Sequence, residues 1–159
     1  MPHNRSVHAI ALVLLLATAL GCSGLHPYKN NLDKNLVVRT ITASGSILTS
    51  VKARIDIYTV DDACDISYRG TVDLQRPEVA LGLPDSGATY LNFVFSSSSF
   101  LAGAQGTTGF DTYLTTRPGY EYLAEASYVD GIYDVIFKEK KVGGSQLREL
   151  DYGECKPKI

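Results

Sequence analysis

From residue 36 onward, hydrophobic and polar residues alternate along most of the chain. Alternation with a period of two is typical of β-strands that bury one face. The segment at 90–95 should be a central strand, because it places Leu91, Phe93 and Phe95 on one face. No stretch after residue 22 repeats hydrophobic residues at helical spacing, so helices should be short or absent. The alternating pattern predicts strands at 36–42, 51–59, 70–75, 90–95, 113–116 and 146–152.

A β-hairpin over 120–141 is the clearest structural signal in the sequence. Asp130-Gly131 suits the two central positions of a type I′ turn, which both require positive φ. The face of the hairpin that points away from the core is mixed, with a favourable charge pair between Glu121 and Lys140. Counting outward from the turn predicts cross-strand pairs, all but the first on the packed face: Val129 with Ile132, Tyr128 with Tyr133, Ala126 with Val135, Ala124 with Phe137 and Tyr122 with Glu139.

About seven short strands, separated by turns rich in Gly and Pro, predict a single all-β domain over 36–159. We expect an antiparallel β-sandwich, immunoglobulin-like or transthyretin-like in outline. A small closed β-barrel is the alternative, which the sequence alone does not separate from the sandwich. The chain has no Trp, so the buried Trp typical of immunoglobulin domains is missing and only the architecture is suggested.

Two segments lack the alternation. Asp61-Asp62-Ala63-Cys64-Asp65 carries three carboxylates, but its spacing differs from that of an EF-hand loop and no Gly lies at its bend, so we interpret it as a solvated turn. The segment 96–109 predicts a long loop, and long loops on β scaffolds often carry binding residues. Phe100 and Leu101 are therefore candidate contacts with a partner, unless they cover an open end of the core.

The first 22 residues follow a different pattern, in which a leader containing Arg5 precedes an apolar run at 11–22. This run is shorter than the roughly 20 apolar residues that span a bilayer, and its charged start and small-residue end are typical of a secretion signal. Ala19-Leu20-Gly21-Cys22 resembles the lipobox of bacterial lipoproteins, which more often has Leu in place of Ala19. An ordinary cleavable signal or a buried signal anchor is the alternative.

The lipobox resemblance implies that residues 1–21 are removed and that Cys22 is diacylated on sulfur, becomes the new N-terminus and anchors the chain in a bilayer. In the sorting pattern of this family, Asp after the lipidated Cys favours the inner membrane. Ser23 occupies this position, so the resemblance favours the outer membrane. The polar segment 22–35, broken by Pro27, predicts a tether that lifts the domain up to roughly 40 Å from the membrane.

Removal of residues 1–21 leaves about 138 residues, enough for one domain with a proper core. The removed segment has one cation, Arg5, and no acidic residue, so 14 Lys and Arg accompany 17 Asp and Glu, a net charge of −3. Such weak acidity argues against a nucleic-acid partner. With Cys22 lipidated, Cys64 and Cys155 are expected to form a disulfide that stabilises the fold by roughly 4 kcal/mol.

The sequence offers little for catalysis or metal binding. His26 is the one histidine of three that remains after processing, and it lies in the predicted tether, so neither a Ser-His-Asp nor a Cys-His arrangement is supported. Phosphate-binding loops of the Walker type and the His-Glu-x-x-His zinc motif are both absent from the sequence. Glu121 and Glu125 lie roughly 13 Å apart along one strand, further than a glycosidase pair. We expect no enzyme, no cofactor and no metal site.

A short motif resembles a different class of protein. Ser86-Gly87-Ala88-Thr89-Tyr90 is similar to the Ser-Gly-x-x-Tyr signature of the periplasmic and membrane-bound inhibitors of c-type lysozyme, which are small, disulfide-tied β lipoproteins. The resemblance implies that Ser86 points into the cleft of the target enzyme. That family has a Lys-Gly motif shortly downstream, whereas no Lys occurs here between Tyr90 and Lys138.

These features predict a non-enzymatic outer-membrane lipoprotein that acts as a binding or structural module in the cell envelope. The expected partners are the bilayer, through acylated Cys22, and another envelope protein, through Phe100 and Leu101 or the tyrosine-bearing edge of the hairpin. Inhibition of lysozyme is the alternative function. Because many functions share one architecture, the fold alone constrains this prediction weakly.

Overall fold

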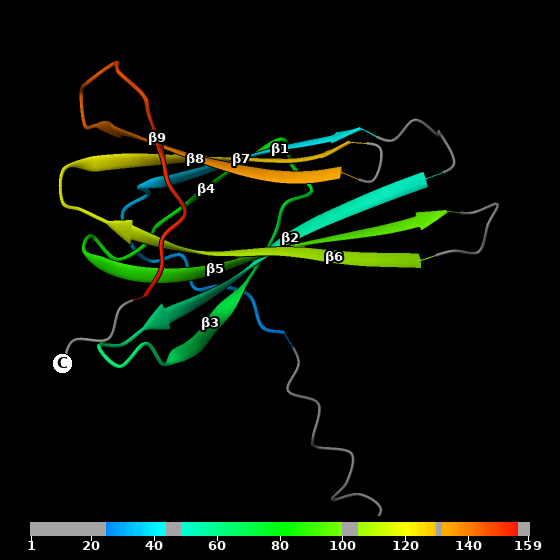
Figure 1. Cartoon of the computed structure of the whole chain (residues 1–159), viewed down its shortest axis with the longest axis horizontal. Helices are drawn as coiled ribbons and strands as arrows, with labels where there is room; N and C mark the ends of the chain where they lie inside the picture. The colour runs from blue at the N-terminus through cyan, green and yellow to red at the C-terminus, as the bar shows by residue number, and fades with distance from the viewer. Residues whose placement is uncertain (1–24, 44–48, 100–104, 130–131, 156–159) are drawn as a thin grey trace, which may run out of the picture.

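The computed structural model describes residues 25–43, 49–99, 105–129 and 132–155. These residues form two β-sheets packed face to face and not closed into a barrel, which confirms the predicted β-sandwich (Figure 1). The described part of the chain contains nine strands: β1 (Leu36–Ala43), β2 (Thr49–Val60), β3 (Ile66–Asp73), β4 (Glu78–Leu81), β5 (Gly87–Ser99), β6 (Gln105–Thr116), β7 (Tyr120–Val129), β8 (Ile132–Lys141) and β9 (Arg148–Leu150).

The five-stranded sheet has the order β4-β1-β7-β8-β9, and the four-stranded sheet has the order β3-β2-β5-β6. Strands β1 and β7 run parallel, whereas the other neighbouring strands are antiparallel. The five-stranded sheet is therefore mixed, which corrects the expectation of purely antiparallel sheets. A tight hairpin cannot join parallel strands, so β1 and β7 need a long connection. All four strands of the other sheet lie between them in the chain.

The β7–β8 hairpin has the register predicted from its sequence. All the predicted pairs are present, from Val129 opposite Ile132 to Tyr122 opposite Glu139. On the outer face, the predicted ion pair also forms, with an N···O distance of 2.9 Å. The turn dipeptide, 130–131, lies outside the described residues. The agreement shows that local turn chemistry and alternation are sufficient to set the register of a hairpin.

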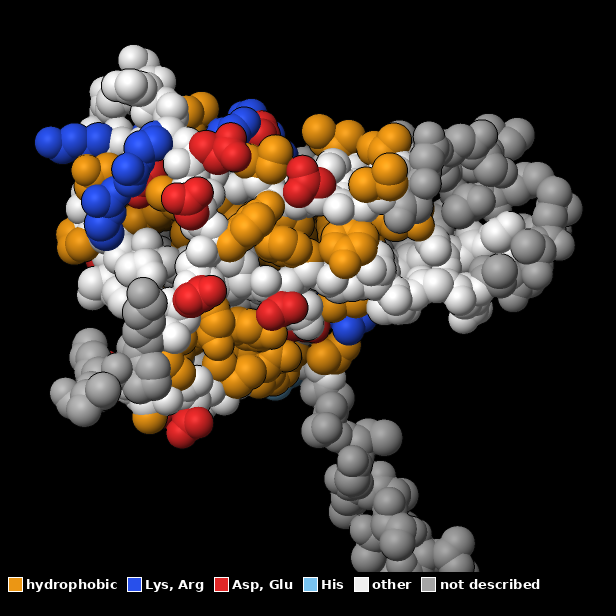
Figure 2. All heavy atoms as spheres, viewed as in Figure 1, with side chains coloured by type: hydrophobic (Ala, Val, Ile, Leu, Met, Phe, Trp, Pro, Cys, Tyr) orange, Lys and Arg blue, Asp and Glu red, His pale blue; other side chains and the backbone are white. Residues whose placement is uncertain are grey.

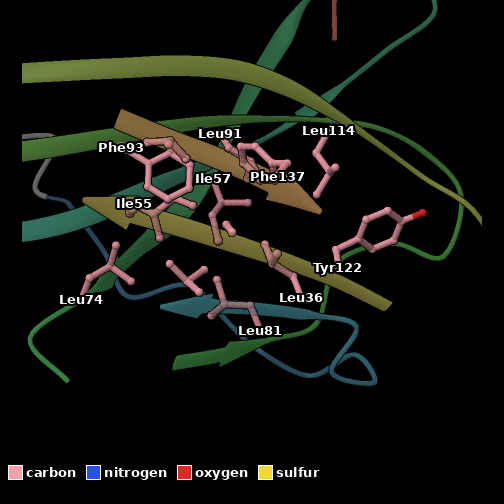
Figure 3. Close-up of a cluster of buried hydrophobic side chains, with 14 of the residues drawn as sticks. Leu36, Ile55, Ile57, Leu74, Leu81, Leu91, Phe93, Leu114, Tyr122 and Phe137 are labelled. Carbon is pink, nitrogen blue, oxygen red and sulfur yellow. The ribbon is translucent and has the colours of Figure 1, made fainter. Parts of the chain in front are cut away.

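The hydrophobic core lies between the two sheets (Figure 3). As expected for a central strand, Leu91, Phe93 and Phe95 of β5 are 0%, 0% and 1% exposed. The ring of Phe93 meets that of Phe137 from the opposite sheet at 5.9 Å in an edge-to-face arrangement. Burial of each such side chain stabilises the fold by roughly 1.5–3 kcal/mol, so the inward positions of both sheets are strongly specified.

The segment at 96–109 is not a long loop, contrary to the prediction. Strands β5 and β6 both continue into this segment and pair with each other along it. Hydroxyl groups contact one another across the strands, as between Ser50 and Ser98 at 2.9 Å. The prediction failed because runs of serine, threonine and glycine carry no hydrophobic alternation that would reveal a strand. Phe100 and Leu101 lie outside the described residues.

Residues 25–35 lie along the domain surface, which corrects this part of the predicted tether at 22–35. The Tyr28 hydroxyl donates to the carbonyl of Gly82 at 2.8 Å. The Asn35 side chain donates to the Leu83 carbonyl at 3.0 Å and accepts from its N–H at 2.8 Å. Hydrogen bonds with distant parts of the chain therefore fix this segment, which polarity and Pro27 alone suggested would be extended.

Two glycines allow residues 25–35 to lie close against the backbone of the domain. A Cβ atom at Gly70 would lie 2.5 Å from the Cα of Tyr28, and one at Gly82 would lie 2.3 Å from the carbonyl oxygen of Leu32. Both distances are shorter than any normal contact between these atoms. A side chain at either position would displace residues 25–35 from the domain.

The predicted disulfide between Cys64 and Cys155 is present and joins residues 91 positions apart. The C-terminal segment reaches Cys64 by crossing from the five-stranded to the four-stranded sheet (Figure 1). On the way, the Tyr152 hydroxyl donates to the carbonyl of Val135 at 3.0 Å, and Gly153 forms a bridge with Tyr113 of β6. The disulfide therefore closes a connection between the two sheets.

A buried carboxylate lies at one end of the core. Glu139 is 4% exposed, and its Oε1 accepts hydrogen bonds from Arg117 at 2.5 Å and from Arg148 Nε at 3.0 Å. Burial alone would raise the pKa of Glu139, but the hydrogen bonds and charges of both arginines outweigh burial and lower it. Because the folded pKa is lowered, this group stabilises the fold at neutral pH, and the contribution is lost as the pH falls through the folded pKa.

We predict that Glu139→Gln lowers the free energy of unfolding at neutral pH by about 1–3 kcal/mol, because an amide cannot balance two guanidinium groups. The difference from the wild type should shrink as the pH falls below the unfolded pKa of about 4, and it is lost once the pH has passed through the lowered folded pKa, where the wild-type carboxylate is also protonated. Urea unfolding at neutral and at acidic pH measures the difference in free energy of unfolding between the variant and the wild type. Glu149→Gln, on the exposed neighbour of Arg148, is the control, and equal costs for the two variants would contradict the prediction.

Candidate functional site

The outer face of the four-stranded sheet carries a row of tyrosines, one from each strand. Neighbouring ring centroids are 5.4, 5.3 and 5.1 Å apart, and the planes are inclined by 58–71°. The ring of His26 lies 4.9 Å from the first ring and extends the row. Figure 2 shows hydrophobic side chains gathered on the lower side of the molecule, over this sheet. We call the four residues the tyrosine row: Tyr68 of β3, Tyr58 of β2, Tyr90 of β5 and Tyr113 of β6.

The alternation of the strands places these rings outside. Ile57, Leu91 and Leu114 are 2%, 0% and 3% exposed, and each lies next to a tyrosine that must therefore face outward. Every ring of the row is half-buried, because its neighbours cover its sides. Inclined aromatic pairs contribute about 0.5–1.5 kcal/mol each beyond burial, so the row is a pre-formed surface.

A buried network holds the Tyr68 end of the row in place. Asp56 is 4% exposed and accepts a hydrogen bond from the Thr71 hydroxyl at 2.5 Å. The Arg54 guanidinium lies 3.4 Å from the same carboxylate. The Thr71 hydroxyl is also hydrogen-bonded to the hydroxyl of Tyr68 at 2.6 Å. This chain of contacts fixes the ring of Tyr68 and satisfies the charge of Asp56.

The hydroxyls of Tyr90 and Tyr58 are neutral donors and acceptors. Burial raises the pKa of Tyr90 to about 12, and a hydrogen bond with Asp111 adds to the rise. Burial, followed by the charge of Asp56, also raises the pKa of Tyr58. Both hydroxyls are therefore protonated at neutral pH and suit hydrogen bonding at an interface rather than acid–base chemistry.

A groove with a volume of about 500 Å³ lies between residues 26–32 and the Tyr68 end of the row. None of the residues that line it is acidic, and both of its cations, Lys29 and Arg69, are exposed. Aromatic, aliphatic and cationic side chains thus meet in one place. This combination suits a ligand that is apolar on one side and carries phosphate or another anion on the other.

The residues predicted from the sequence do not meet at the tyrosine row. Ser86 is exposed at the turn before β5, whereas Tyr90, from the same five-residue motif, belongs to the row. Cys22, Phe100 and Leu101 lie outside the described residues. The row itself was not predicted, although tyrosines at outward positions of predicted strands were a signal for it.

The acidic residues considered in the sequence have structural partners. Asp61 Oδ1 accepts the N–H groups of Ala63 and Asp65, each at 2.9 Å, and thereby shapes the turn. Glu121 and Glu125 each form an ion pair with a lysine of β8. Within the described ranges, no group of three or more His, Cys, Asp or Glu side chains could hold a metal ion.

A second surface lies on the outer face of the five-stranded sheet. Ile41, Val129 and Ile132 are 58%, 40% and 73% exposed, and we call them the aliphatic patch. Val129 lies directly opposite Ile132, and Ile41 is on the adjacent strand β1. Exposed apolar side chains that adjoin one another, unlike isolated ones, are typical of interaction surfaces.

Comparisons of the chain with protein-family models, with curated proteins and with solved structures find no match. In the part of the chain that the structure describes, no helix is long and apolar enough to span a bilayer.

We predict that Tyr90→Phe reduces the loss of stability at alkaline pH. The folded pKa of Tyr90 is raised to about 12, so its protonated form stabilises the fold fully below the unfolded pKa near 10, and this contribution is lost between the two values. The slope from this one group is up to about 1.4 kcal/mol per pH unit. Urea unfolding from about pH 9 upward measures it, and equal slopes in wild type and variant would contradict the prediction.

Proposed function

We propose that this chain is a non-enzymatic lipoprotein of the bacterial outer membrane that acts as a binding or structural module in the cell envelope. The observation that carries the proposal is a lipobox-like segment ending at Cys22, directly followed by a β-sandwich with aromatic and aliphatic side chains on its outer faces. Surfaces of this kind suit binding, since tyrosine and exposed aliphatic residues are common at interfaces.

The disulfide supports a location outside the cytoplasm. Cys64 and Cys155 are joined, and structural disulfides persist in oxidising compartments such as the bacterial periplasm. Cys22 is the one remaining cysteine of the sequence, and it lies where a lipobox places the acylated residue. The identity of Ser23 favours the outer membrane over the inner membrane.

The aliphatic patch is the surface that we assign to a partner protein of the envelope. Its residues lie at the end of the sandwich where β5 ends and β6 begins (Figure 1). Phe100 and Leu101, the contacts proposed from sequence, follow the last residue of β5 in the sequence and lie outside the described residues. Anchoring on a membrane raises the effective concentration of the module, so an interface of modest area would suffice.

We predict that Cys22→Ala abolishes acylation and releases the protein from the membrane fraction. In bacteria grown with an alkyne analogue of palmitate, the wild-type chain should be labelled, and mass spectrometry should place the label on Cys22. The double variant Cys64→Ala/Cys155→Ala is the control, because it removes the other two cysteines and should keep the label. Labelling that survives in Cys22→Ala would contradict the anchor.

We predict that a photo-crosslinking residue in place of Ile132 captures a discrete envelope protein in cells, because this side chain is 73% exposed within the aliphatic patch. A second probe in place of Ser86 serves as the comparison. Capture by the probe at position 132 and not by the probe at position 86 supports the aliphatic patch as the surface that binds the partner. Capture of lysozyme at Ser86, together with loss of lysozyme inhibition in Ser86→Ala, would instead support the inhibitor function that the Ser-Gly-x-x-Tyr resemblance implies.

A further inference from the structure

The described chain begins beside the tyrosine row. His26 packs against Tyr68, and Ser23 and Gly24 are the residues between Cys22 and Leu25. Since an extended chain spans at most about 3.6 Å per residue, the Cα atom of Cys22 lies within about 14 Å of that of His26. Any bilayer that holds acyl chains on Cys22 is therefore close to this end of the row.

The side chains around this point have the composition of a membrane-contacting surface. Leu25 and Leu32 are 58% and 48% exposed although they are large and apolar. Leu32 lines the groove together with the exposed Lys29 and Arg69, and none of the residues lining that groove is acidic. Leucine enters the headgroup boundary, tyrosine favours it, and lysine and arginine bind lipid phosphates.

We infer that the outer face of the four-stranded sheet rests on the bilayer, with the groove end of the tyrosine row against the lipid headgroups. This inference depends on the proposed acylation of Cys22. Leu25 and Leu32 enter the interfacial region, Lys29 and Arg69 contact lipid phosphates, and the hydroxyl of Tyr68 lies at headgroup level. Because residues 25–35 are fixed to the domain, the anchor sets its orientation as well as its position.

The orientation assigns different partners to the two faces of the sandwich. The two sheets pack face to face, so their outer faces point in opposite directions (Figure 1). With the four-stranded sheet on the membrane, the five-stranded sheet and the aliphatic patch face away from it. The bilayer is then the partner of the tyrosine row, and an envelope protein is the partner of Ile41, Val129 and Ile132.

A tryptophan probe tests the orientation, since the natural chain has no Trp. Tyr68→Trp is prepared as the full acylated protein and reconstituted in vesicles of phosphatidylethanolamine and phosphatidylglycerol, with or without brominated acyl chains. We expect a blue shift and loss of emission with brominated lipid. Ile132→Trp, on the opposite face, should keep its emission. His26→Trp repeats the test at an exposed position if Tyr68→Trp does not fold.

Neutralising the cations tests the headgroup contact. Adding Lys29→Gln and Arg69→Gln to Tyr68→Trp should lower the ratio of docked to undocked protein by about 30-fold on anionic vesicles, which restores emission. The mass of the N-terminal peptide verifies acylation in each sample. An unacylated peptide would refute the proposed function, whereas acylated protein with equal quenching at positions 68 and 132 would refute the orientation alone. A blue shift of the tryptophan emission at position 68 with peptidoglycan fragments but not with vesicles would also overturn the orientation.

Discussion

The strand register of the four-stranded sheet is the constraint on which both the core and the tyrosine row depend. Tyr58, Tyr90 and Tyr113 lie directly opposite one another because the inward neighbours of each tyrosine are held in the core. A shift of one residue would turn these rings inward and expose several large aliphatic side chains, each at a cost of roughly 1.5–3 kcal/mol. The core therefore sets the positions of these three rings in the row.

The sequence was sufficient where the determining residues are close together. The β7–β8 hairpin could be predicted because its turn dipeptide and both strands lie within 120–141. The disulfide could be predicted from the number of cysteines and the compartment. The tyrosine row could not, because its members come from four strands, and a register shift between Ile57 and Tyr58 decides whether Tyr68 joins them. Side-chain alternation gives the face of each residue but not its neighbours across strands.

Each edge strand of the four-stranded sheet is bridged at one position by an end of the described chain. Pro27 forms a bridge with Thr71 of β3, and Gly153 forms one with Tyr113 of β6. The second bridge depends on the absence of a Cβ atom, because a Cβ at Gly153 would lie 2.3 Å from the carbonyl oxygen of Tyr113. A bridge on each edge strand interrupts the row of free backbone groups and thereby opposes strand addition by another chain at these positions. A glycine in the sequence signals a close approach but does not identify the segment that approaches, which is why the tether prediction failed.

The attachment of residues 25–35 to the domain also changes how a membrane anchor would act. A free tether of the predicted length would let a domain turn either face toward the membrane, and surface chemistry would have little influence on which face met lipid. When residues 25–35 are fixed to the domain, Leu25 and the acylated cysteine proposed upstream must lie on the same side of it. Leu32, Lys29 and Arg69 supply the apolar and cationic side chains that contact with headgroups on that side requires, whereas the lysines on the outer face of the five-stranded sheet are paired with Glu121 and Glu125.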